Sequence, residues 1–317
     1  PEAFDLLLRR GHFLDLGAED LEKIALERMA EEEGATALGG PPLNPTQPDP
    51  YLERFAELWQ AARDLAERDN LLTFPDWPVQ YVEQPAWGRD TAPSFYFLPY
   101  RAPAPFDASS AVQYFVPPTA DESTIKLNHV VHHGSLGHHV QNWHAARARS
   151  RIGQLAAVDC ASRIAMLCGG TLAEGWACYA TDLAEEHGFL TPAEQFAQHT
   201  ARLRMAARAV VDIRLHQGRL TVDEAAEFYH QRVGMSDGAS RSEAIKNSLF
   251  PGTACMYLAG WDGIWRLRRQ FSGPQTLSLR QFHDLLLSFG SVPVSLVGRS
   301  MREANGTGTP ATALANR

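Results

Sequence analysis

Hydrophobic residues recur at helical spacing in two segments near the start of the chain. From Asp20 to Glu33 apolar residues recur at helical spacing with acidic residues between them, and Gly34 follows as a stop signal. A second pattern extends from Tyr51 to Leu72 and has a clear apolar face. Between them, five of the twelve residues 39–50 are proline, which disfavours both helix and central strand. The pattern predicts two helices joined by a linker.

Residues 75–117 follow a different period. Three runs of aromatic and β-branched residues are bounded by turn residues, namely Trp77–Glu83, Ser94–Leu98 and Ala111–Val116. These runs predict three strands of a small antiparallel sheet. From about Ile125 to Leu287 the pattern is helical again.

The predicted fold class is therefore mainly α with a small antiparallel β-sheet. We divide the chain into an N-terminal helical segment (1–38), a Pro-rich linker (39–50), a main domain (51–302) and a tail (303–317). The tail is rich in Ala, Thr, Gly and Asn, and we expect it to be disordered.

Composition restricts the partners and the location. The 317 residues are 44% hydrophobic and 21% charged, which is typical of a globular protein. A net charge of −8 argues against binding to nucleic acid or to an anionic membrane. The four cysteines, Cys160, Cys168, Cys178 and Cys255, lack C-x-x-C spacing and indicate thiols of a reducing compartment, so we expect a cytoplasmic protein. Because residue 1 is Pro, secretion after removal of a signal peptide stays open, as does the oligomeric state.

Histidines gather in one short segment. Six of the twelve lie within 16 residues: His129, His132, His133, His138, His139 and His144. Imidazole is the commonest ligand of zinc-like ions, so the enrichment favours a metal site. The alternative is a set of solvated or core histidines on an amphipathic helix.

Spacing alone leaves the ligand pair open. His129 and His133 are four residues apart, about 40° around a helix, and could share a metal directly. His132 and His138 would lie about 120° and roughly 9 Å apart on an unbroken helix. They could meet only if the helix opened between them, and Gly134 and Gly137 permit such an opening.

A glutamate in a later helical segment adds a third candidate ligand. Glu174 follows His138 by 36 residues. Two histidines on one helix and a glutamate on a following helix form a His2Glu zinc site with an open fourth position, which is typical of a catalytic metal. Taken alone, Glu174 has the character of an ordinary solvated helix residue.

These segments resemble those of the DUF885 family of bacterial proteins. His132–Gln141 is similar to the family pattern H-E-x-x-P-G-H-H-x-Q, and Glu174–Ala177 matches its E-G-W-A segment. Further matches are Arg204–His216, Pro251-Gly252 with Tyr257, and Phe282–Leu286, so that the resemblance covers roughly residues 50–302. The resemblance implies a zincin-like metallopeptidase architecture with His132, His138 and Glu174 as metal ligands. It implies zinc as the metal, with iron or manganese as alternatives.

One departure from the family pattern affects the chemistry. The family has Glu, the expected general base, where this chain has His133. His133 could transfer protons in its place, or it could bind the metal as an extra ligand and close the open position. Leu136 also replaces the family's Pro, and Lys246-Asn247 replaces its Arg-Tyr pair.

Four further residues are candidates for work on a substrate. Tyr257 could donate a hydrogen bond to an oxyanion, or could be a core tyrosine. Arg208 could bind a substrate carboxylate while His216 lines the cleft, or Arg208 could form an ion pair with Asp212. Lys246 could bind an anionic group, or could simply be an exposed lysine.

Three functions are consistent with the sequence. The first is a metal-dependent hydrolase that cuts an amide bond in a peptide or peptide-like small molecule, with His133 as base. The second is a non-hydrolytic metal-dependent lyase, cyclase or transfer enzyme of specialised metabolism, in which the metal polarises a carbonyl. The third is a non-catalytic metal-binding protein descended from a peptidase. No G-x-S-x-G, P-loop or G-x-G-x-x-G motif occurs in the sequence.

Overall fold

Helices make up most of the structure, a computed structural model that describes residues 2–37, 39–41, 47–86, 100–101, 111–155 and 169–306. Before the sheet lie α1 (Glu2–Leu6), the π-helix η1 (Leu7–Gly11), α2 (Ala18–Thr36) and α3 (Tyr51–Arg68). The strands are β1 (Val79–Glu83), β2 (Tyr100–Arg101) and β3 (Val112–Val116). Next come α5 (Glu122–Thr124), the π-helix η2 (Ile125–Gly134), α6 (His138–Ala146) and α7 (Arg151–Leu155). The remaining helices are α9 (Gly170–Glu186), α10 (Pro192–His216), α11 (Val222–Val233), α12 (Asp237–Leu249), α13 (Cys255–Phe271), α14 (Leu279–Ser288) and α15 (Val294–Gly306).

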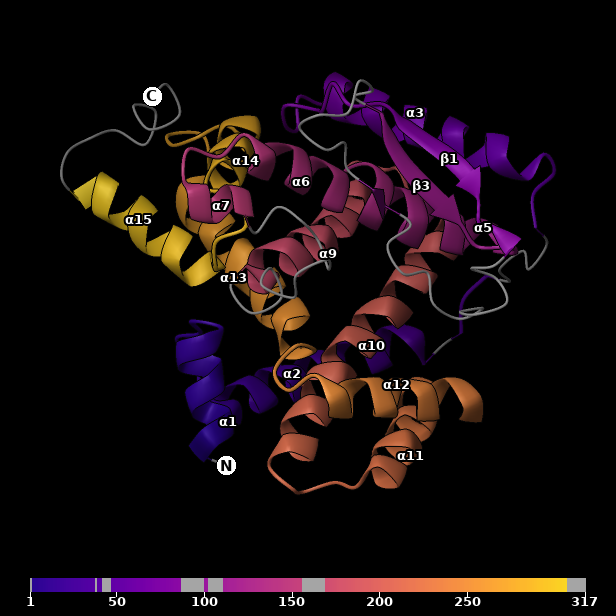
Figure 1. The fold of residues 1–317 in the computed structure, drawn as a ribbon, viewed down its shortest axis with the longest axis vertical. Helices are drawn as coiled ribbons and strands as arrows, with labels where there is room; N and C mark the ends of the chain where they lie inside the picture. Colours follow the sequence, from indigo (N-terminus) through magenta and orange to yellow (C-terminus); the bar gives the residue numbers. More distant parts are fainter. Residues whose placement is uncertain are drawn as a thin grey trace.

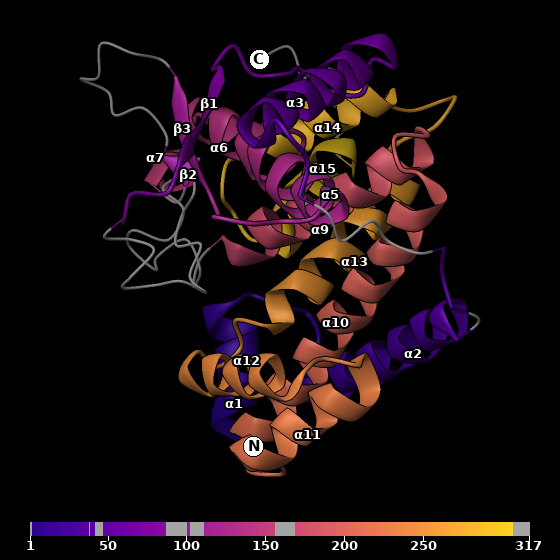
Figure 2. The same cartoon turned by 90° about the vertical axis from the view of Figure 1, so that its right-hand side faces the viewer.

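Two long helices connect the two ends of the molecule. Figure 1 shows α10 and α13 running between a lower group, α1, α2, α11 and α12, and an upper group that contains the sheet, α3, α6 and α9. The view turned by 90° shows the same arrangement (Figure 2). Buried apolar side chains of both groups form one continuous core. The predicted N-terminal segment contributes to it through Leu21, Ala25 and Met29 of α2.

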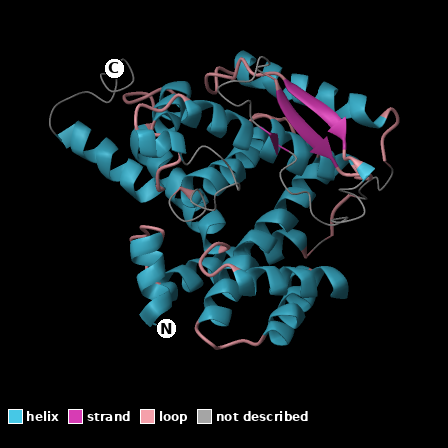
Figure 3. Cartoon of the chain, viewed as in Figure 1, coloured by secondary structure: helices cyan, strands magenta, loops and turns pink. Residues whose placement is uncertain are grey.

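The small sheet corrects one prediction. The strand order is β1-β3-β2, and the longer pair, β1 with β3, is parallel from Val79↔Val112 to Glu83↔Val116. The antiparallel arrangement that we predicted is therefore wrong for this pair, and only the two-residue strand β2 runs antiparallel to β3. A tight turn would force antiparallel pairing, whereas the long connection from β1 to β3 lets the chain return and enter β3 in the same direction. Figure 3 shows the strands gathered at one corner of a helical molecule.

Several predicted helices and strands have counterparts in the structure. The first and third predicted strands correspond to β1 and β3, whereas Ser94–Leu98 lies outside the described residues. The two predicted N-terminal helices correspond to α2 and α3. Helix α15 continues to Gly306, into the predicted tail, and residues 307–317 lie outside the described part of the chain.

Helices α9 and α13 approach each other at two glycines. A Cβ added to Gly175 would lie 2.3 Å from the carbonyl carbon of Gly260, and one added to Gly260 would lie 1.9 Å from the Thr171 oxygen. Only glycine permits such contact between two backbones. The contact fixes the position of Glu174 on α9 relative to Tyr257 on α13.

Candidate metal centre

The histidine segment is interrupted at the glycines that permit an opening of the helix. The π-helix η2 carries His132 and His133 and ends at Gly134, and α6 begins at His138. The backbone N–H of Gly137 donates to the Val131 carbonyl at 2.8 Å. A Cβ on Gly137 would lie 1.9 Å from the His132 carbonyl oxygen, so the sharp turn between the two helices requires glycine. The opening that Gly134 and Gly137 permit is therefore present between His132 and His138.

Side chains from other helices satisfy the backbone groups that this break exposes. Trp59 of α3 donates its indole N–H to the Gly134 carbonyl at 2.7 Å, and Trp176 of α9 donates to the Leu136 carbonyl at 2.9 Å. The Ser135 hydroxyl donates to the Val130 carbonyl at 2.9 Å. These bonds stabilise an irregular turn that would otherwise leave buried carbonyls unpaired.

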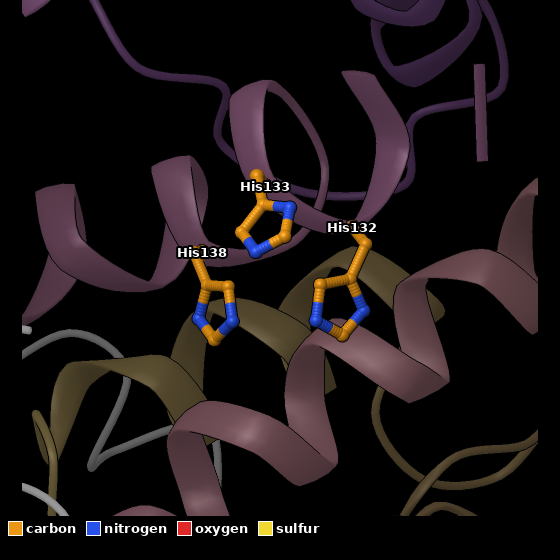
Figure 4. A group of neighbouring side chains, drawn as sticks. All are labelled: His132, His133 and His138. Carbon is orange, nitrogen blue, oxygen red and sulfur yellow. The ribbon is translucent and has the colours of Figure 1, made fainter. Parts of the chain in front are cut away.

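Three histidine rings meet at this turn. The ring centres of His132 and His138 are 4.9 Å apart, those of His132 and His133 are 4.8 Å apart, and those of His133 and His138 are 5.3 Å apart. One ligand nitrogen from each lies within 4.8 Å of the other two. Figure 4 shows the three rings around a common point.

Glu174 of α9 approaches the same point. Its Oε2 atom lies 3.4 Å from Nε2 of His138 and 3.8 Å from Nε2 of His132. Oε2 is buried, and within the described residues it makes no hydrogen bond. Ligands that bind one tetrahedral zinc ion at 2.0–2.1 Å are about 3.3 Å apart. His132, His138 and Glu174 therefore fit a metal ion.

The protonation states suit ligands. Burial opposes ionisation of Glu174, but the neighbouring His138 and His132 hold its pKa well below the usual range. Burial lowers the pKa of His132, and it lowers that of His133 further. Ionised carboxylate and neutral imidazole are the forms that bind metals.

His133 has a defined tautomer. Its Nδ1 lies 2.7 Å from the backbone carbonyl of Asn128, which can only accept a hydrogen bond. Nδ1 therefore carries the proton, and Nε2 of the neutral ring carries the lone pair.

The other clustered histidines have different partners. His129 Nδ1 forms a hydrogen bond with the Tyr114 hydroxyl at 2.9 Å, and His144 donates from Nε2 to the Thr73 carbonyl at 3.0 Å. The His139 ring packs against Trp59, with 6.3 Å between ring centres. His139 therefore packs among aromatic side chains next to His138 in the sequence.

Tyr257 and Arg208 continue the site away from the histidines. Burial, and next the negative charge of Glu174, raise the pKa of the Tyr257 hydroxyl well above its ordinary value. The Arg208 guanidinium lies 5.6 Å from the centre of the Tyr257 ring. Glu174, Tyr257 and Arg208 therefore follow one another across α9, α13 and α10.

The ion pair of Arg208 differs from the one considered above. Arg208 donates twice to Glu243 of α12, at 2.7 and 3.0 Å, and Arg204 donates to the same carboxylate at 2.7 Å. Lys246 lies one helical turn further along α12. Lys246 is exposed, and partial desolvation and next the charge of Arg208 lower its pKa, while Glu243 and Glu174 oppose the shift. The structure therefore groups Lys246 with Arg208.

Asp212 and His216 have a local role. The Asp212 carboxylate accepts the backbone N–H groups of Gly252, Ala254 and Cys255 at 3.0, 2.9 and 3.2 Å. It also lies 2.8 Å from Nδ1 of His216, whose ring stacks on Phe4. His216 is eight residues beyond Arg208 on α10, about 12 Å along the axis.

The sequence comparison identifies the family. The family model for bacterial proteins of unknown function (DUF885) matches residues 36–301. The chain belongs to the DUF885 family. No curated protein matches this DUF885 chain.

Two solved structures share the DUF885 chain's fold. One is of a predicted lipoprotein from Colwellia psychrerythraea, with a TM-score of 0.76 and 22% identity, covering 96% of this chain and 55% of that one. The other is of a predicted lipoprotein of unknown function from Shewanella oneidensis, with a TM-score of 0.75 and 17% identity, covering 95% and 59%. The chain thus spans somewhat more than half the length of each. Among its described residues, no helix is both long and apolar enough to cross a membrane.

Proposed function

We propose that this DUF885 protein is a metal-dependent enzyme whose metal is held by His132, His138 and Glu174. The position of Glu174 Oε2 carries the proposal. This buried carboxylate oxygen makes no hydrogen bond within the described residues, and lies at ligand-like distances from Nε2 of both histidines. Burying a charge is costly unless it is paired or coordinates a metal. Zinc is the first candidate, with iron or manganese as alternatives.

The surrounding side chains support catalysis on a polar substrate. When bound, the metal would polarise a carbonyl oxygen of an amide or peptide-like small molecule. Tyr257, whose pKa is raised, keeps its hydroxyl proton and can donate a hydrogen bond to an oxygen that gains negative charge. His133 presents an unprotonated Nε2 beside His132 and His138.

The charge of the site favours a substrate with a negative group. Arg204, Arg208 and Lys246 are grouped with a single carboxylate, Glu243. Both arginines already bind Glu243, so Lys246 is the cation that would meet a substrate carboxylate first. His216 lies at the far end of α10, beside Asp212 and Phe4, and has no part in this proposal.

The two enzyme hypotheses differ in whether a water molecule is activated. In a zincin-like peptidase, His133 would take a proton from water, whereas in a lyase, cyclase or transfer enzyme no water is activated. The variant His133→Glu restores the family's residue. If it creates peptidase activity, the native protein has lost hydrolysis; if it abolishes an existing hydrolysis, His133 is the working base.

Metal content tests the proposal. The purified protein, incubated with zinc, iron(II) or manganese(II) and then desalted, is analysed by elemental mass spectrometry. We expect about one metal per chain, lost in His138→Ala and in Glu174→Gln. A matched control is His230→Ala, which removes a half-exposed histidine of α11 and should keep the metal. A native protein that takes up none of the three metals would overturn the proposal.

The location is a separate question. The sequence predicts the cytoplasm, whereas the two similar structures are described as lipoproteins, which favours a location outside the cytoplasm. Fractionation of cells that express the native gene, with an antibody against the chain, decides between them.

A further inference from the structure

We infer that His133 is a fourth metal ligand, which completes a His3Glu set with His132, His138 and Glu174. This inference rests on the proposed metal site and deepens it. It assigns to His133 a role different from the proton transfer expected at this position of the family pattern.

The positions of the rings support this assignment. Neighbouring residues on an α-helix point about 100° apart, so that His132 and His133 would normally face different surroundings. On the π-helix η2 their ring centres are only 4.8 Å apart, much like the 4.9 Å between His132 and His138. A base that takes a proton from a metal-bound water lies one water further from the ion than the ligands do. His133 instead lies 4.8 Å from His132 and 5.3 Å from His138 between ring centres, within about half an ångström of the separation between His132 and His138.

The hydrogen bond of His133 has the form expected for a ligand. Metal-binding histidines donate their second ring N–H to a carboxylate, a backbone carbonyl or water, which fixes the tautomer and the ring orientation. The His133–Asn128 bond does this at 2.7 Å, five residues back along the π-helix. Figure 4 shows a nitrogen of His133 directed between the rings of His132 and His138.

A fourth ligand changes the expected chemistry. Four protein ligands fill the coordination of a tetrahedral zinc ion, and such sites are structural. Metals that accept more than four ligands, such as iron(II) and manganese(II), retain positions for a substrate. The His3Glu set therefore favours the non-hydrolytic enzyme, which would hold iron(II) or manganese(II), over a zinc peptidase.

X-ray absorption of the cobalt(II)-loaded native protein tests the inference without any variant. We expect three imidazoles per cobalt, and a count of two would overturn the inference. Titration with cobalt(II), followed by visible absorption, gives the affinity of variants. His133→Ala should weaken binding at least about 100-fold, more than loss of an outer-shell partner does. An affinity within two-fold of the native value would also overturn it.

Two further variants separate this inference from the proposed function. His139→Gln changes the adjacent buried histidine, which packs on Trp59, and should keep native affinity. If His138→Ala abolishes binding while His133→Ala does not, only the fourth ligand is wrong. If neither variant changes binding, the proposed metal site itself is wrong.

Discussion

The indole N–H of Trp176 donates a hydrogen bond to the backbone carbonyl of Leu136 at 2.9 Å. Trp176 lies two residues after Glu174 on α9, and Leu136 lies in the turn between His133 and His138. This one bond therefore joins the helix that carries the carboxylate to the turn that positions the histidines.

Replacing Trp176 by Phe should loosen this connection. The variant leaves the buried Leu136 carbonyl without its donor and removes part of a fully buried side chain, so we expect a loss of about 2–3 kcal/mol in the free energy of unfolding. Metal affinity should fall as well. Urea denaturation and cobalt(II) titration measure the two effects. Trp143→Phe, which removes an exposed bond to Asp76, serves as the control and should change stability by less than about 1 kcal/mol.

Gly137 should not tolerate a side chain. In Gly137→Ala the new Cβ would meet the His132 carbonyl oxygen at 1.9 Å, which the fixed turn cannot relieve. We expect a loss of about 3 kcal/mol or more, together with loss of the metal. Gly238→Ala is the matched control, because nothing lies within 4 Å of the added Cβ in the first turn of α12. This control should be neutral or up to about 1 kcal/mol more stable, and equal behaviour of the two variants would contradict the geometry.

Some of this site could be predicted from the sequence, and the reasons are local. His132 and His138 can meet only if the helix opens between them, and the two glycines between them showed where such an opening was permitted. The π-helical winding of η2 was not predicted. A short segment with more than 3.6 residues per turn has the same kinds of side chain as an α-helix, so the sequence pattern does not distinguish the two. His133 could therefore not be oriented from spacing alone.

Long-range pairings were beyond the reach of local patterns. Spacing along α10 suggested Asp212 as the partner of Arg208, but the Asp212 oxygens bind backbone N–H groups at the start of α13. Backbone donors have no signature in the sequence, and Glu243, the true partner, lies on a different helix. The direction of β1 against β3 was missed for a similar reason, because the connection between them decides it.

Glu243 should be important for stability and for acid resistance. Glu243→Gln leaves Arg204 and Arg208 without their counter-ion, and we expect a loss of about 2–3 kcal/mol in chemical denaturation at pH 7. Asp223→Asn breaks an exposed pair with Arg241 and should cost less than about 0.5 kcal/mol.

The acid dependence of the same variant follows from the pKa of Glu243. Burial opposes ionisation, but the charge of Arg208 outweighs it and lowers the pKa from 4.5 to about 2. A lowered pKa stabilises the folded state above pH 4.5, and this contribution is lost as the pH falls towards 2. The stability difference between native protein and Glu243→Gln should shrink over that range. A constant difference would show that the carboxylate charge is unimportant.

His216 should contribute stability with the opposite pH dependence. Burial opposes its protonation, but hydrogen bonds to the Asp212 side chain and backbone outweigh burial and raise its pKa above 6.5. The contribution is therefore complete below pH 6.5 and is lost as the pH rises through the raised pKa. Burial lowers the pKa of His12, the other histidine near Asp212, although the charge of Asp212 opposes the shift.

The comparison of native protein with His216→Gln measures this effect. Their difference in the free energy of unfolding should be larger at pH 6 than at pH 9, by about 1 kcal/mol. An identical difference at both pH values would rule out a charged His216–Asp212 pair.

The contact between Gly175 and Gly260 has a consequence for how sequences of this kind can vary. Because backbone meets backbone there, the distance between α9 and α13 at this crossing is set by main-chain atoms and not by the size of a side chain. Substitutions elsewhere in the core can raise or lower the melting temperature and leave that spacing unchanged. The melting temperature and the geometry of the site can therefore change independently in this chain, as long as the two glycines are kept.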